Sequence, residues 1–93
     1  MIISDEMWEI LGPSTEAYED IQREDVESGL LSGDFRLFMA PHSLAVTCAY
    51  GKALRVGLAG GDLEELVGIE HDICSYAQDN DFSSVEIIGR PGW

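Results

Sequence analysis

Hydrophobic residues follow two different periods along the chain, and the change of period separates a helical first third from a strand-rich remainder. Up to residue 33 they recur at spacings of three and four, which is typical of short amphipathic helices. We expect a first helix over residues 4–11 that ends at Gly12-Pro13. A second is expected to begin at Ser14 or Thr15, and a third to end at Gly33. The three apolar faces contain Met7, Trp8, Ile10 and Leu11, then Ala17, Tyr18 and Ile21, and finally Val26, Leu30 and Leu31.

After residue 34 the pattern changes to short apolar runs rich in β-branched and aromatic residues. Strands are predicted over 35–40, 44–50 and 53–59, and the short turns between them favour an antiparallel meander. A helix over 62–79 and a strand over 84–88 follow, so that the last two strands become parallel neighbours in a βαβ unit. The pattern predicts one α+β domain, residues 1–93, with N-terminal helices, a three-strand antiparallel meander and then the βαβ unit.

The helix over 62–79 has the strongest signals. Asp62 and Glu65 form a capping pair, and Asn80 is suited to close the helix. The predicted apolar stripe consists of Leu63, Leu66, Val67, Ile69, Ile73, Tyr76 and Ala77. In many enzymes a phosphate binds the free amides at the start of such a helix. Here Asp62, Glu64 and Glu65 occupy that place, and their carboxylates would repel a phosphate.

The net charge of −13 is distributed unevenly along the 93 residues. Residues 1–34 hold ten acids and one base, residues 35–61 hold three bases and no acid, and residues 62–93 hold eight acids and one base. Binding to nucleic acid or to an anionic membrane surface is disfavoured, because clustered Lys and Arg are absent. A basic protein surface is the natural electrostatic partner. There is no 18-residue apolar run and no secretory signal, so we expect a cytoplasmic or particle-associated location.

The order of elements and several short motifs resemble the GNAT acetyltransferases over residues 14–93. Residues 36–50 look like the hairpin that opens their sheet, and residues 54–61 look like the strand that carries their coenzyme-A loop. The runs Gly29-Leu-Leu-Ser-Gly-Asp-Phe and Leu58-Ala-Gly-Gly-Asp-Leu, with the ending Gly89-Arg-Pro-Gly-Trp, resemble small phage-encoded GNAT-like proteins. The resemblance implies an incomplete GNAT-like sheet, because the closing helix and last strands of that fold are missing, which leaves a sheet edge without cover.

The coenzyme-A loop of that family has the pattern Gln/Arg-x-x-Gly-x-Gly/Ala. Arg55 and Gly60 have the separation of its two ends, but Leu58 stands where the first glycine belongs, and Arg55 falls inside a predicted strand. No cofactor-binding residue is therefore assigned, and acetyl-CoA is expected only if the chain is an enzyme.

No residue pattern supports catalysis or metal binding. His42, with the neighbouring hydroxyl of Ser43, and His71 are interpreted as ordinary histidines, and the acidic pairs as solvated helix faces. A zinc site from the two histidines and two cysteines is possible by count, but no spacing between them is typical of metal ligands. Cys48 and Cys74 are therefore interpreted as buried reduced thiols. Tyr50 and Tyr76 are assigned to core packing. The candidates for an interface are Trp8, Trp93 and Arg90 near the chain ends, with closure of the domain's own core as the alternative for the two tryptophans.

Three functions follow as hypotheses. The first is a non-catalytic protein-interaction or structural component, phage-encoded and virion-associated, that binds a protein partner or forms a homo-oligomer. The second is an acetyl-CoA-dependent N-acetyltransferase that acts on a basic amine. The third is an acidic mimic that inhibits a nucleic-acid-binding protein.

Overall fold

The computed structural model describes residues 3–15 and 21–87, and it contains three helices and four strands in those ranges. Their order is α1 (Asp5–Thr15), α2 (Arg23–Ser32), β1 (Phe35–Ala40), β2 (Ser43–Tyr50), β3 (Ala53–Gly60), α3 (Leu63–Asp79) and β4 (Ser84–Ile87). The predicted α+β class is confirmed, and the strand boundaries agree with the sequence prediction to within one residue.

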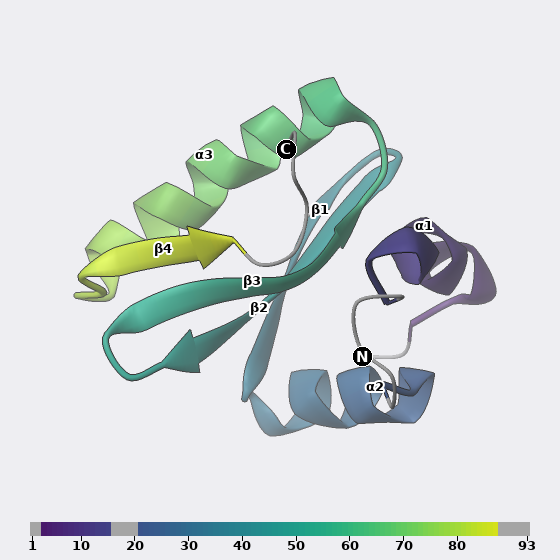
Figure 1. Ribbon diagram of the computed structural model, residues 1–93, viewed down its shortest axis with the longest axis horizontal. Helices are drawn as coiled ribbons and strands as arrows, with labels where there is room; N and C mark the ends of the chain where they lie inside the picture. The colour runs from purple at the N-terminus through teal and green to yellow at the C-terminus, as the bar shows by residue number, and fades with distance from the viewer. Residues whose placement is uncertain (1–2, 16–20, 88–93) are drawn as a thin grey trace.

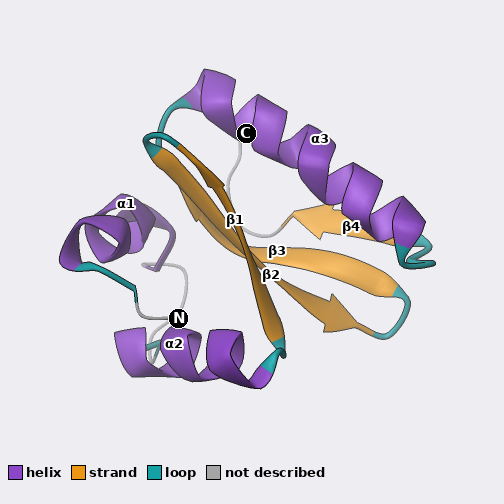
Figure 2. Cartoon of the chain, turned by 180° about the vertical axis from the view of Figure 1, so that it is seen from behind, coloured by secondary structure: helices purple, strands orange, loops and turns teal. Residues whose placement is uncertain are grey.

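The four strands form one mixed sheet in the order β1-β2-β3-β4. The first three pair antiparallel as the meander predicts, and β4 lies parallel to β3 as the βαβ unit predicts. Helix α3 lies on one side of this sheet, and α1 and α2 lie on the other (Figures 1 and 2). The result is a three-layer arrangement in which the sheet is the central layer.

Each side of the sheet has its own apolar cluster. The cluster under α3 consists of Ala45, Leu54, Val56, Ala59, Leu66, Ile69, Ile73 and Ala77. The cluster under α1 and α2 consists of Ile3, Leu11, Val26, Leu44, Val46 and Leu58. Strand β2 contributes to both, because successive side chains of a strand point to opposite faces.

A β-bulge at Gly57 changes which residues of β3 face each cluster. The register passes from Val46↔Leu58 to Thr47↔Val56, so that Gly57 is the extra residue of β3. Val56 therefore packs under α3 and Leu58 under α1 and α2, although both are even-numbered positions of one strand. Without the bulge both side chains would lie on the same face.

The structure corrects the boundaries of the N-terminal helices. The predicted end at Gly12-Pro13 is wrong, because α1 continues through both residues to Thr15. The fixed φ of proline is compatible with helix, so the backbone can remain helical through Pro13 at the cost of one i→i−4 hydrogen bond and of crowding against the preceding turn. The second predicted helix begins within α1, and most of its length lies outside the described residues. The third prediction is confirmed, since α2 ends at Gly33 in the left-handed conformation, with φ of 89°.

The apolar stripe predicted for α3 is only partly buried. Leu66, Ile69, Ile73 and Ala77 belong to the core, whereas the side chains of Leu63 and Val67 are 58% and 54% exposed. The prediction counted both as core because they share the three- and four-residue spacing, but the sheet covers a narrower arc of the helix than the apolar residues span. None of the helices in the described segments has the length and apolar character needed to cross a membrane.

Candidate functional site: the N-terminus of helix α3

Two glycines connect β3 to α3 and bring the β1–β2 turn against the start of the helix. Gly61 has φ of 120°, a conformation that residues with a side chain rarely adopt. A Cβ atom there would lie 2.4 Å from both the carbonyl oxygen of His42 and the hydroxyl of Ser43. Only glycine at this position allows the turn to approach so closely.

The backbone amides at the start of α3 bond to the chain's own side chains. The N–H of Asp62 donates to Oγ of Ser43 at 2.9 Å, and the N–H of Glu64 donates to Oδ1 of Asp62 at 2.9 Å. These are donors of the kind that bind a phosphate when a helix start is open. At Asp62 and Glu64 they are already satisfied.

The predicted capping pair is correct for Asp62 and wrong for Glu65. Asp62 is the N-cap, but the carboxylate of Glu65 does not accept a hydrogen bond from the backbone N–H of Asp62. Instead Oε1 of Glu65 accepts from the hydroxyl of Ser43 at 2.7 Å and from the backbone N–H of His42 at 2.9 Å. The physical reason is that Ser43 already supplies the acceptor for Asp62, which leaves Glu65 to bind the turn.

The electrostatic environment of this site is negative. Three carboxylates, those of Asp62, Glu64 and Glu65, belong to the N-cap and the first turn. The nearby imidazole of His42 is exposed, and its Nδ1 lies 3.8 Å from Oε2 of Glu65. The hydroxyl of Ser43 bonds to Glu65 rather than to His42, so these residues do not form the hydroxyl–imidazole pair of a nucleophilic site.

The three residues that correspond to the coenzyme-loop pattern have structural contacts. Nε and Nη2 of Arg55 donate to Oε1 of Glu86 at 3.1 and 2.9 Å, and the guanidinium lies 3.9 Å from the centre of the Tyr50 ring. Leu58 is buried beneath α1 and α2. A Cβ atom on Gly60 would lie 1.9 Å from the carbonyl oxygen of Ile10, so Gly60 lies directly against α1.

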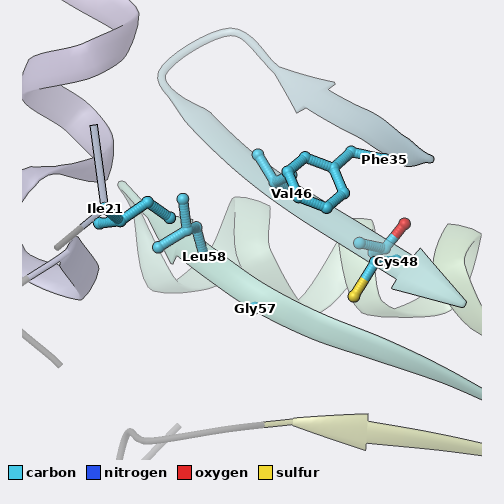
Figure 3. A pocket seen from close by; sticks show the side chains of 7 residues that line it. Ile21, Phe35, Val46, Cys48, Gly57 and Leu58 are labelled. Carbon is cyan, nitrogen blue, oxygen red and sulfur yellow. The ribbon is translucent and has the colours of Figure 1, made fainter. Parts of the chain in front are cut away.

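A separate apolar pocket of about 140 Å³ lies between β2, β3 and the segment before α2 (Figure 3). Its lining consists of Ile21, Phe35, Val46, Thr47, Cys48, Gly57 and Leu58. The Thr47 hydroxyl donates to the carbonyl oxygen of Arg36, and the free Cys48 is half-buried. The lining offers a thiol but no carboxylate or imidazole, so it suits a small apolar group and provides no acid–base pair.

The two histidines and two cysteines are not brought together as one group in the described part of the chain: His71 and Cys74 line the same groove on α3, whereas His42 and Cys48 belong to the β1–β2 turn and to β2. No group of three His, Cys, Asp or Glu residues there is close enough to hold a metal ion. Both cysteines are free, but the prediction that both are buried is wrong, because Cys48 is half-buried and Cys74 is exposed on α3. Spacing along the chain did not reveal that position 74 lies on the outer surface of its helix.

The aromatic candidates have different environments. Tyr76 packs against Phe38 with ring centres 5.8 Å apart, which confirms its assignment to the core. Tyr50 is 63% exposed, so its assignment to the core is wrong. Trp8 is half-buried and packs against the cluster under α1 and α2, and the interface candidates Arg90 and Trp93 lie outside the described residues.

Strand β1 is an edge of the described sheet, and a groove lies near each of its two ends, both on the side of α1 and α2. One groove of about 150 Å³ lies between α1 and the end of β1, where Met7, Ile10, Met39 and Glu6 contribute to its lining. The other, of about 270 Å³, is lined by Leu30, Phe35, Arg36 and Leu37. Met39 is 58% exposed. Strand β1 has six residues, none of which is proline or acidic, so its outer edge can pair with a further strand.

Comparisons with known proteins provide no relative for this chain: no family model matches it, and no similar curated protein or solved structure was found.

Proposed function

We propose that the chain is a non-catalytic protein-interaction component on a GNAT-like scaffold, phage-encoded and virion-associated. The observation that carries the non-catalytic part concerns the start of α3. There Ser43 and Asp62 accept hydrogen bonds from the backbone amides that a coenzyme phosphate would need. The GNAT-like scaffold is supported by the α3 crossover between parallel β3 and β4. The phage origin rests on the short motifs described from the sequence.

The proposed docking surface is the outer edge of β1. A partner segment in an extended conformation would pair with the backbone of β1, and its side chains that point to the α1 and α2 side would enter the two grooves. The chain is strongly acidic, and Glu6 lines the groove beside α1, so a basic residue of the segment would complement that groove, whereas Arg36 lines the other groove. The proposed partner is therefore a protein with a basic, extended segment, and not a nucleic acid or a membrane.

A titration with acetyl-CoA tests the non-catalytic part. We expect a thermal midpoint that does not change when acetyl-CoA is raised to millimolar concentration, because the amides of Asp62 and Glu64 are occupied. A saturable upward shift of several degrees would contradict the proposal. It would favour the acetyltransferase instead.

Site-specific photocross-linking tests the docking surface. A photoreactive residue in place of Met39, on β1, is expected to capture a discrete partner from a cell extract. The matched control has the same residue in place of Asp72, which is exposed on α3, on the other side of the sheet. Capture of the same proteins at both positions, or at neither, would contradict docking along β1.

A further inference from the structure

Helix α3 has a lateral stripe of residues that are exposed, apart from the half-buried Glu70. The stripe consists of Leu63, Val67, Glu70, His71, Cys74 and Gln78. A groove of about 280 Å³ lies along its middle, lined by Val67, Glu70, His71 and Cys74. Leu63 and Val67 are among the most exposed large apolar residues, and the thiol of Cys74 is free. Three of the six residues, Leu63, Val67 and Cys74, are apolar and exposed, and they follow one another along one flank of the helix.

The position of the lateral stripe follows from the contacts of the opposite flank. Glu65 and Tyr76 reach toward β1, where Glu65 bonds to the β1–β2 turn and Tyr76 packs on Phe38. At 3.6 residues per turn, Val67 and Cys74 lie about half a turn around the helix from those two. The lateral stripe is therefore on the flank away from β1, free of the surface proposed for the partner segment.

The residues of the lateral stripe are arranged symmetrically about the middle of the helix. Residues 63 and 78, 67 and 74, and 70 and 71 are each equidistant from the point between Glu70 and His71. A two-fold axis through this point would place two copies of α3 antiparallel. It would bring Val67 of each copy opposite Cys74 of the other, which matches apolar surface with apolar surface.

The same axis brings Glu70 of each copy opposite His71 of the other. Within the described part of the chain neither side chain has an ion pair or hydrogen bond, so both are available to a second copy. An imidazole donates an N–H to a carboxylate whether it is neutral or charged. Two reciprocal Glu–His contacts at the centre would offset part of the repulsion between two acidic chains.

We infer that α3 is a homodimer interface, in which the lateral stripes of two copies pack antiparallel with Glu70 of each against His71 of the other. The helix has 17 residues and is about 25 Å long, so the interface is small and the dimer is weak and concentration-dependent. This inference does not depend on the proposed function, because the dimer leaves β1 free.

Disulfide trapping tests the register. In a Cys48→Ala background, Val67→Cys is expected to form a covalent dimer on mild oxidation, through a bond between position 67 of one copy and Cys74 of the other. Cys74 alone is expected to stay reduced, because seven residues, about 10 Å along each helix, separate the two copies of it. The control is Leu31→Cys, on α2 and 68% exposed. If Val67→Cys yields no more dimer than this control, the interface is wrong.

A charge exchange tests the central contact independently of thiol chemistry. His71→Glu places like charges opposite each other and is expected to raise the dimer dissociation constant about tenfold. Adding Glu70→Lys should restore it to within about twofold. The control Glu24→Lys, on α2, changes the net charge as much as Glu70→Lys but should not rescue His71→Glu. A wild-type chain that sediments as a monomer at about 1 mM, or rescue by Glu24→Lys, would overturn the inference.

Discussion

The hydroxyl of Ser43 donates a 2.7 Å hydrogen bond to the carboxylate of Glu65, a residue 22 positions further along the chain. The same hydroxyl oxygen accepts the N–H of Asp62, so one buried side chain joins the start of β2 to the start of α3. This contact connects the meander to the βαβ unit and also takes up a backbone donor that an anionic ligand would otherwise use.

Replacing Ser43 with alanine is expected to lower the free energy of unfolding by about 2 kcal/mol, because the N–H of Asp62 and the carboxylate of Glu65 both lose a partner. Urea denaturation measures the change. Ser75→Ala, at an exposed position on α3, is the control and should change stability by less than about 0.5 kcal/mol. Equal effects for both variants would mean that the Ser43 contact contributes little.

Two glycine-to-alanine substitutions are expected to have opposite signs. Gly61→Ala should destabilise the fold by about 2 kcal/mol or more, because φ is 120° and the new Cβ would clash with the His42–Ser43 backbone. Gly68→Ala should stabilise it by about 0.5–1 kcal/mol, because a Cβ there meets open space in the middle of a helix. Thermal and urea unfolding of the pair distinguishes these signs, and a stable Gly61→Ala would contradict the close approach.

Gly60→Ala is expected to displace α1 from the sheet, because its Cβ would lie 1.9 Å from the carbonyl oxygen of Ile10. Trp8 belongs to this helix and packs on the adjacent cluster, so its fluorescence should shift to longer wavelength as water reaches the ring. A Trp93→Phe background makes the signal specific to Trp8. An unchanged spectrum, with native circular dichroism, would show that α1 does not depend on Gly60.

Ile73→Ala and Leu63→Ala compare a buried and an exposed position on the same helix. Ile73 is 1% exposed, and its truncation should cost about 2–5 kcal/mol of unfolding free energy through lost burial and a cavity. Leu63 is 58% exposed and should cost less than about 0.5 kcal/mol at micromolar protein concentration. A large loss for Leu63→Ala in dilute solution would mean that this residue is buried in the single chain.

Glu86→Gln tests how much the Arg55 contact contributes. The carboxylate of Glu86 accepts hydrogen bonds from Nε and Nη2 of Arg55, but the Glu86 side chain is 46% exposed. We therefore expect the free energy of unfolding to fall by no more than about 1 kcal/mol. The stacking of Arg55 on Tyr50 is expected to persist, since it does not use the carboxylate. High salt should reduce the difference between wild type and variant, and a salt-independent loss would contradict an electrostatic origin.

Local interactions determined the elements that the sequence predicted well. The strands β1 and β2 follow from short apolar runs bounded by turn residues, and the end of α2 follows from a glycine that adopts the left-handed conformation. These signals act over about four residues, within the range of turn and capping contacts. The parallel pairing of β3 and β4 also followed, because a helix between two strands leaves few other connections.

Only the tertiary structure decided what depends on distant residues. The partner of Glu65 is Ser43 rather than the N-cap, since the β1–β2 turn reaches the start of α3 only after the sheet has formed. The same is true of the arc of α3 that the sheet covers, which buries Ile73 and leaves Val67 exposed despite their common periodicity. The isolated glycine in β3 was a local sign of the bulge, but the register that places Val56 and Leu58 on opposite faces is a property of the paired strands. Amphipathic spacing identifies which residues share a helix face, whereas packing against the other layers decides which part of that face meets water.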